Sequence, residues 1–346
     1  MAGTATIRAM SDVRVVSERS ELRTFLIHVL AFALIFACMV SLVNLLYIQY
    51  VIPQKIVFQT NSVFDSVLLR NDSLQYVFVG DSHPYFAIDA QYISNSVNLA
   101  SISENYAITY HKLRILTERR ANFTHTIVLQ VDPHSFRSEM LKDTSLTPDN
   151  IYFYSQVVPF ATLYSLYENS NISLLKFLTY RWLPSVGNGI DFLRRDGHIP
   201  FFFNIGGDSI GVHQVPLNEM KESAVNRVSK KMSGAEFEPL LVDFYTAILS
   251  LAKENNISVI LIVYPHSKEF DEELVRRNIS LDSYYQHIDS MTQEVFVQGY
   301  TVLNYYDYFF NDSSLMYDAD HITKEASALF SADVADRLTL YERMNQ

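Results

Sequence analysis

Residues 75–84, QYVFVGDSHP, place an apolar run directly before a glycine and three polar residues. The run has the length and the aromatic and β-branched content of a buried strand, and Gly80 ends it. Pro84 suits the first turn of a helix, and apolar residues then recur at near-helical spacing from Tyr85 toward Ser94. The stretch therefore predicts a strand, a tight turn and a helix.

Strands and helices continue to alternate after this stretch. Apolar runs predict further strands at 96–99, 126–131, 257–265 and 301–306. Helical patterns occur near 104–117, 235–254, 281–297 and 324–341. This alternation is typical of a mostly parallel sheet with helices on both faces. We therefore expect a doubly wound α/β domain.

Residues 135–234 interrupt the alternation. They are rich in Tyr, Phe, Ser and Asn and contain WLPSVGNG at 182–189 and IPFFFNIGGDSIG at 199–211. We interpret them as a large insertion with little regular structure, which lies over or beside the carboxyl edge of the sheet. Such an insertion either shapes a binding cleft or serves only as structural padding.

An apolar segment at 25–52 contains no Asp, Glu, Lys or Arg. It exceeds the roughly 20 residues that cross a bilayer core. A cleaved signal peptide would have a shorter apolar region and a small-residue cleavage site, and a buried core helix is rarely apolar on every face. Four arginines precede the segment, at positions 8, 14, 19 and 23, whereas only Lys55 follows it closely.

The charge asymmetry predicts the topology of the chain. We expect a cytoplasmic tail at 1–24, a single transmembrane helix at 25–52 and an extracytoplasmic domain at 53–346. A short polar stretch joins the helix to the first strand, so the domain should be tethered close to the bilayer. His28, Asn44 and Gln49 lie toward the ends of the helix, where the interface can hydrate them. Tyr47 and Tyr50 suit one interfacial aromatic belt.

Composition excludes several function classes. The formal net charge is -11, and basic residues are scattered, which removes the electrostatic footprint of a nucleic-acid-binding protein. The single cysteine, Cys38, lies inside the apolar segment. The domain therefore has no disulfide framework, no cysteine metal site and no cysteine nucleophile.

Ser82 is the first candidate for chemistry. A serine on a tight turn between a parallel strand and a helix projects beyond the carboxyl edge of the sheet, where amides at a helix N-terminus can face an oxyanion. Its hydroxyl is a weak nucleophile until a base removes the proton. The hypothesis therefore needs a histidine, and preferably a carboxylate to orient it.

The sequence YDADH at 317–321 supplies both groups between the last predicted strand and the final helix. Asp318 and His321 are three residues apart, which places them on one side of a turn or helix start. Taken singly, Ser82 could be an ordinary N-cap and His321 a surface residue at a capped helix start. A second Gly-Asp-Ser at 207–209 lies in the insertion without a helical pattern after it, so we prefer the first.

The combined motifs resemble the SGNH (GDSL-like) hydrolase superfamily, in which a nucleophilic serine follows the first strand and an Asp-x-x-His pair precedes the last helix. With the anchor, the chain looks most similar to membrane-anchored SGNH-like proteins that act with membrane-bound O-acyltransferases, such as the alginate O-acetylation and teichoic-acid D-alanylation factors. The resemblance covers about 75–134 and 257–340. It implies that Ser82 is the nucleophile, His321 the general base and then acid, and Asp318 the orienting carboxylate.

Two blocks depart from the superfamily pattern. VNLASIS at 97–103 lacks the usual oxyanion-hole glycine, and Asp132-Pro133-His134 stands where an asparagine is usual. Backbone amides near Ser82 and Ala100 remain as donors. The residues that we expect to bind the oxyanion or the substrate are Asp81, His83, Asn98, Ala100, Asp132 and His134. A metal site from Asp81, His83 and His134 is an alternative, but their spacing is not compact, so we expect neither metal nor cofactor.

These features predict a serine-dependent O-acyltransferase that acts on an exported or cell-surface glycan, with acetyl as the expected group. A multispanning O-acyltransferase partner would deliver the acyl group across the membrane. One alternative is an anchored carbohydrate esterase that uses water as acceptor. Another is a non-catalytic SGNH-like accessory protein, which the two missing oxyanion-hole residues favour.

Overall fold

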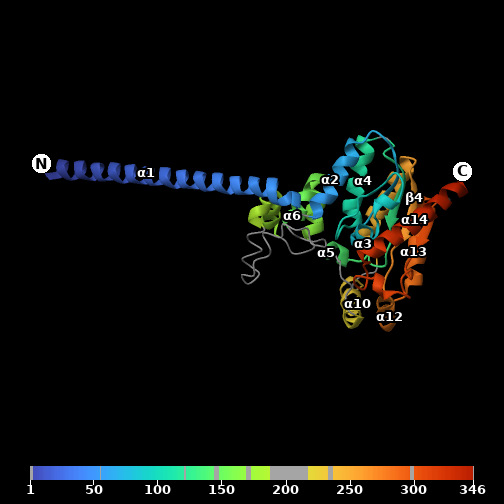
Figure 1. Cartoon of the computed structure of the whole chain (residues 1–346). Coiled ribbons are helices and arrows are strands. Elements are labelled where there is room, and N and C mark those ends of the chain that lie inside the picture. The colour runs from blue at the N-terminus through green and yellow to red at the C-terminus, as the bar shows by residue number, and fades with distance from the viewer. Residues whose placement is uncertain are drawn as a thin grey trace.

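An N-terminal helix, α1 (Gly3–Leu46), projects away from the remaining chain (Figure 1). The computed structural model describes residues 3–54, 56–120, 122–143, 148–168, 173–187, 217–232, 237–296 and 300–345. Within these ranges, Glu21–Val51 is the one helical span long and apolar enough to cross a bilayer, with a hydropathy of 2.7. The described part of the chain therefore contains one candidate membrane helix, as the sequence predicts.

The end of α1 is bonded to the segment predicted as an insertion. A π-helical turn, η1 (Tyr47–Val51), and a 3-10 turn, η2 (Ile52–Gln54), follow α1. The Tyr47 hydroxyl donates to Asp149 Oδ1 at 2.9 Å, and Asn44 Nδ2 donates to the Trp182 carbonyl at 3.1 Å. The sequence predicts a hydrated Asn44 and a Tyr47 in an interfacial aromatic belt, but both side chains are buried against this segment.

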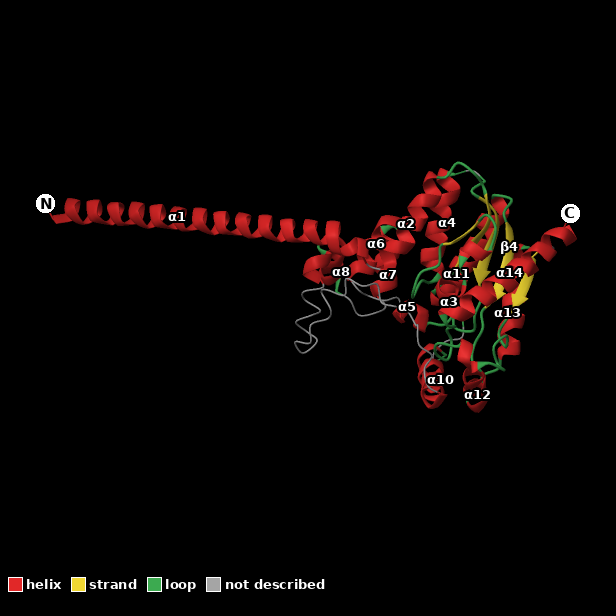
Figure 2. Cartoon of the chain, in the orientation of Figure 1, coloured by secondary structure: helices red, strands yellow, loops and turns green. Residues whose placement is uncertain are grey.

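One parallel five-stranded sheet forms the centre of the body (Figure 2). Its strand order is β2-β1-β3-β4-β5. The central strands are apolar along nearly their whole length because helices cover them, which is typical of parallel sheets. The strands are β1 (Leu74–Val79), β2 (Ser96–Asn98), β3 (Thr124–Gln130), β4 (Ser258–Val263) and β5 (Tyr300–Asn304). Their positions confirm the predicted strands.

Helices connect and cover these strands. Asn105 caps α4 by accepting the N–H groups of Ala107 and Ile108, and α4 packs against α11, which begins with Pro239. The C-terminal helix α14 packs against the short α3. Their bounds are α3 (Ser82–Ala87), α4 (Tyr106–Arg119), α11 (Pro239–Glu254), α12 (Lys268–Arg276), α13 (Leu281–Val295) and α14 (Lys324–Asn345).

The prediction of little regular structure at 135–234 was wrong for its described parts. These form α5 (Glu139–Asp143), α6 (Pro148–Val157), α7 (Phe160–Glu168), α8 (Leu174–Trp182) and α10 (Leu217–Lys231). The aromatic residues that obscured the helical pattern bury one another in a separate small core that includes Tyr154, Tyr167, Phe177 and Tyr180. The second Gly-Asp-Ser, at 207–209, lies outside the described residues.

Two local predictions also need correction. The polar stretch before the first strand contains a helix, α2 (Ile56–Leu69), whose Phe64 and Val67 pack into the main core. The helix predicted to continue toward residue 94 ends at Ala87. There Asn98 Nδ2 donates to the carbonyls of Pro84 at 2.7 Å and Ile88 at 3.0 Å, and the Ile88 carbonyl is an acceptor that a longer helix would use for its own backbone.

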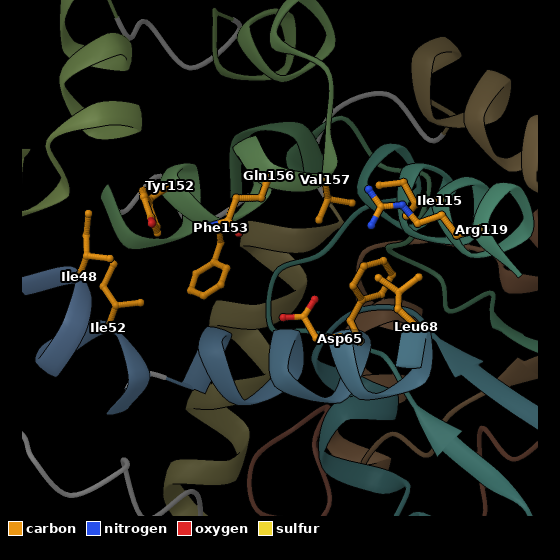
Figure 3. A pocket seen from close by; sticks show the side chains of 11 residues that line it. Ile48, Ile52, Asp65, Leu68, Ile115, Arg119, Tyr152, Phe153, Gln156 and Val157 are labelled. Atoms are coloured by element: carbon orange, nitrogen blue, oxygen red, sulfur yellow. The ribbon is translucent and has the colours of Figure 1, made fainter. Parts of the chain in front are cut away.

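A cavity of about 340 Å³ lies between α2, α4, α6 and the turns η1 and η2 that follow α1 (Figure 3). Its walls are mostly apolar and include Ile48, Ile52 and Phe153, while Asp65 and Arg119 add opposite charges. No candidate catalytic residue lines it. The cavity therefore belongs to the junction between α1 and the body.

Candidate active site

The turn after β1 presents Ser82 as the first residue of α3. Gly80 has a φ of +147°, in a region that glycine adopts readily and other residues rarely do. Asp81 caps α3 by accepting the N–H of His83 at 2.9 Å. At the end of β3, Gln130 Oε1 accepts the N–H of Asp81 at 2.7 Å. These contacts fix the Ser82 hydroxyl at the carboxyl edge of the sheet.

The loop between β5 and α14 carries Asp318 and His321. An antiparallel bridge between Met316 and Ile322 closes the loop. The Asp318 carboxylate accepts the N–H groups of Asp320 at 3.0 Å and His321 at 2.9 Å. The turn itself therefore orients this carboxylate.

Ser82, His321 and Asp318 form a continuous hydrogen-bonded relay. His321 Nε2 lies 2.8 Å from Ser82 Oγ, and His321 Nδ1 lies 3.0 Å from both carboxylate oxygens of Asp318. A carboxylate only accepts, so Nδ1 carries the proton, and Nε2 of the neutral ring accepts from the serine hydroxyl. The residues are 8%, 6% and 6% exposed, and the Phe86 ring packs on His321. Serine, base and orienting carboxylate thus stand in the order that nucleophilic catalysis requires.

Two cations from α10 reach the same loop. Arg227 Nη2 lies 2.7 Å from Asp318 Oδ2, and its Nε lies 3.3 Å from Asp320 Oδ1. The buried Lys231 ammonium lies 2.9 Å from Asp320 Oδ2. Part of the predicted insertion therefore contributes charged groups to the candidate site. Sequence analysis missed them because this helix was interpreted as irregular.

No protein-family model matches this chain, and no curated protein does. The roles of Ser82, His321 and Asp318 therefore rest on their geometry.

Four of the residues expected to bind the oxyanion or the substrate contact one another. Asp132 Oδ2 accepts from His83 Nδ1 at 2.5 Å and from Gln130 Nε2 at 2.6 Å, while Oδ1 accepts the Tyr264 N–H at 2.7 Å. In the same way, His134 Nε2 lies 2.6 Å from Asp81 Oδ2. These pairs form a buried polar layer beside the nucleophile.

The buried layer shifts several pKa values. Burial opposes a charge on His83, but the carboxylates of Asp132 and Asp81 raise its pKa to about 10. Burial lowers the pKa of His266 to about 3. Burial also opposes ionisation of Asp320, but the charges of Lys231 and other nearby cations hold its pKa well below its usual range. Near pH 7, His83 is a cation, His266 is neutral and Asp320 is an anion.

Asn98 and Ala100 make local contacts. Besides its bonds to α3, Asn98 accepts the Ala100 N–H through Oδ1 at 3.1 Å. This contact occupies the backbone amide that the sequence suggested as an oxyanion donor. Their predicted role in binding an oxyanion therefore finds no support in this arrangement.

Sequence analysis overlooked His266 beside the site. It lies at the carboxyl end of β4, and its ring centroid is 5.1 Å from that of His83. The available signal was its position: a polar residue that follows a buried parallel strand faces the edge where ligands bind.

Proposed function

We propose that this chain is a membrane-anchored enzyme that transfers an acyl group, expected to be acetyl, through a covalent acyl-Ser82 intermediate. The observation that carries the proposal is the relay in which Ser82 Oγ lies 2.8 Å from His321 Nε2. These two residues are 239 positions apart in the sequence, so chain proximity does not account for their contact. Asp318 extends the relay on the opposite side of the imidazole.

The relay supports a two-step transfer. As Ser82 Oγ attacks the carbonyl carbon of an acyl donor, its proton passes to His321 Nε2. His321 then returns this proton to the leaving group, and the acyl-serine ester remains. An acceptor hydroxyl next loses its proton to His321 and attacks the ester, which restores Ser82 and releases the acylated acceptor. Asp318 stabilises the imidazolium that forms in each step.

We assign the body to an SGNH-like, doubly wound fold. The order β2-β1-β3-β4-β5 reverses direction between β1 and β3. With right-handed crossovers, α3 belongs on one face of the sheet and α4, α11 and α13 on the other, while the contact with α3 puts α14 on the first face. Ser82 after β1 and the Asp-x-x-His pair before α14 follow the superfamily order.

The acceptor is inferred from topology. The apolar helix Glu21–Val51 suits an anchor, and the arginines that precede it favour an extracytoplasmic body. Glycans of the cell envelope present hydroxyl acceptors on that side. An acyl donor that starts in the cytoplasm would then require a multispanning partner, as in the systems that the chain resembles.

Covalent labelling in membranes tests the nucleophile. The full-length chain should react with a fluorophosphonate probe, and Ser82→Ala and His321→Ala should each abolish the signal. Ser209→Ala, in the second Gly-Asp-Ser, is the matched control and should label normally. Equal labelling of the Ser82→Ala and unsubstituted chains would sink the proposal, because no other serine is assigned a base.

Acceptor choice requires a second measurement. The purified chain should transfer acetyl from an activated ester to an oligosaccharide more rapidly than to water. Faster release of free acetate would identify an esterase instead. A chain that folds but neither labels nor transfers would be an accessory protein.

A further inference from the structure

Three histidines converge beside the relay. His83, His134 and His266 follow β1, β3 and β4, which are adjacent strands, so their side chains meet at the same edge of the sheet. One ring nitrogen of each lies within 4.8 Å of one from the other two. The three residues are 2%, 1% and 0% exposed. The cluster is therefore enclosed by protein.

One nitrogen of each ring is held by an oxygen that can only accept. His83 Nδ1 lies 2.5 Å from Asp132 Oδ2, and His134 Nε2 lies 2.6 Å from Asp81 Oδ2. His266 Nδ1 lies 2.9 Å from the carbonyl oxygen of residue 264. The held nitrogen must carry the hydrogen, so the opposite nitrogen of each neutral imidazole carries a lone pair.

These opposite nitrogens have no hydrogen-bond partner among the described residues: His83 Nε2, His134 Nδ1 and His266 Nε2. An unsatisfied buried polar atom costs about 1–3 kcal/mol. Asp320 Oδ2 lies 3.6 Å from His83 Nε2 and faces this nitrogen while the ring is protonated. When His83 is neutral, all three nitrogens offer an electron pair, which indicates a missing common partner that accepts electron pairs.

The surrounding charges indicate the charge of this partner. Four carboxylates lie in or beside the cluster: Asp81, Asp132, Asp318 and Asp320. Two cationic side chains pair with the last two: Arg227 and Lys231. Among these described groups, and while the imidazoles are neutral, the four carboxylates exceed the two cations by two charges. A proton on His83 balances one of them, whereas a divalent cation balances both.

We propose that His83, His134 and His266 bind a divalent transition metal of the zinc class, with Asp132, Asp81 and the residue 264 carbonyl as outer-shell acceptors. Imidazole nitrogens suit Zn²⁺, and three histidines that leave a fourth position open are an established ligand set. Acceptors on the far nitrogens hold such ligands in the correct tautomer and orientation. This site revises the sequence-based expectation of no metal, since its ligands come from three separate strand ends.

Binding requires the cluster to contract. Zn–N bonds of about 2.0–2.1 Å place ligand nitrogens about 3.3–3.6 Å apart, so the rings move inward by up to about 1 Å. A metal must also displace the proton from His83, and binding therefore tightens as pH rises. A second group of side chains could also hold an ion: His83, Asp320 and His321. We prefer the three-histidine site, because Asp320 is already paired with Lys231 and His321 is bonded to Ser82.

Zinc titration of the full-length chain in detergent, after treatment with a chelator, tests the site. Isothermal calorimetry should give one Zn²⁺ per chain. His134→Gln and His266→Gln should each weaken the affinity by more than the roughly 10–100-fold that loss of an outer-shell partner costs. His111→Gln is the matched control, because His111 is a buried histidine on α4 outside the cluster. Ser82→Ala should bind zinc normally, which separates this proposal from the proposed function.

Co²⁺ absorption provides a readout without any substitution. Co²⁺ in the unsubstituted chain should give the strong visible bands of a four-coordinate, nitrogen-ligated ion, and Zn²⁺ should remove them. Absence of zinc binding, zinc binding that survives His266→Gln in a folded chain, or a weak spectrum like that of hydrated Co²⁺ would each overturn the proposal.

Discussion

Replacing Gly80 with alanine tests the turn that presents Ser82. The new Cβ would contact Gln130 Oε1, and would lie 2.7 Å from Gln130 Cβ and 2.8 Å from Pro84 Cγ. Gln130 cannot simply move away, because it accepts the Asp81 N–H at 2.7 Å and donates to Asp132 at 2.6 Å. The backbone is an additional obstacle, since φ is +147°.

The loss of stability can be estimated from these two effects. Holding a residue other than glycine in a sparsely populated backbone region costs about 1–3 kcal/mol. Overpacking by a methyl group costs about 1–3 kcal/mol more. The free energy of unfolding should therefore fall by about 2–6 kcal/mol, a large share of the 5–15 kcal/mol typical of a domain.

Urea titration of the full-length chain in detergent, followed by circular dichroism, measures this loss. Asn278→Ala is the control, because Asn278 is exposed with a φ of +56° and already has a Cβ. It should cost about 1 kcal/mol or less. A loss below about 1 kcal/mol for Gly80→Ala, with unchanged fluorophosphonate labelling, would refute the close packing of this turn.

Three further predictions concern charged and buried groups. Asp318→Asn should slow fluorophosphonate labelling of the catalytic serine by at least about 10³-fold, because His321 loses the group that fixes its tautomer. Lys231→Met should lower the free energy of unfolding by about 3–5 kcal/mol in urea titration, since it leaves Asp320 short of a cation, whereas the exposed Lys221→Met should change it little. Burial lowers the pKa of His111 to about 4, so the folded chain binds a proton at this ring less readily than the unfolded chain does. The free energy of unfolding should therefore be insensitive to this group above about pH 6.5, and it should fall as pH drops from there toward 4. His111→Phe should flatten that part of the pH dependence of the urea midpoint.

Strand positions were predictable because the signal is local. The run 76–79 is continuously apolar and ends at Gly80, and the run 259–264 is continuously apolar and ends at Pro265. The same reasoning placed Ser82, Asp318 and His321 at loops beyond the sheet. This reasoning did not predict α10, which is polar on much of its surface and so shows a weak hydrophobic pattern. The stability of this helix depends instead on packing against α12.

Sequence alone thus determined the apolar helix, the parallel sheet and the two loops that carry the candidate relay. These features follow from hydrophobic runs and turn residues within short windows. Only the tertiary structure decided that Arg227 and Lys231 face the carboxylates of the last loop, and that His266 joins His83 and His134. Strand order sets such contacts, because β1, β3 and β4 are neighbours in space although β3 and β4 are separated by more than a hundred residues.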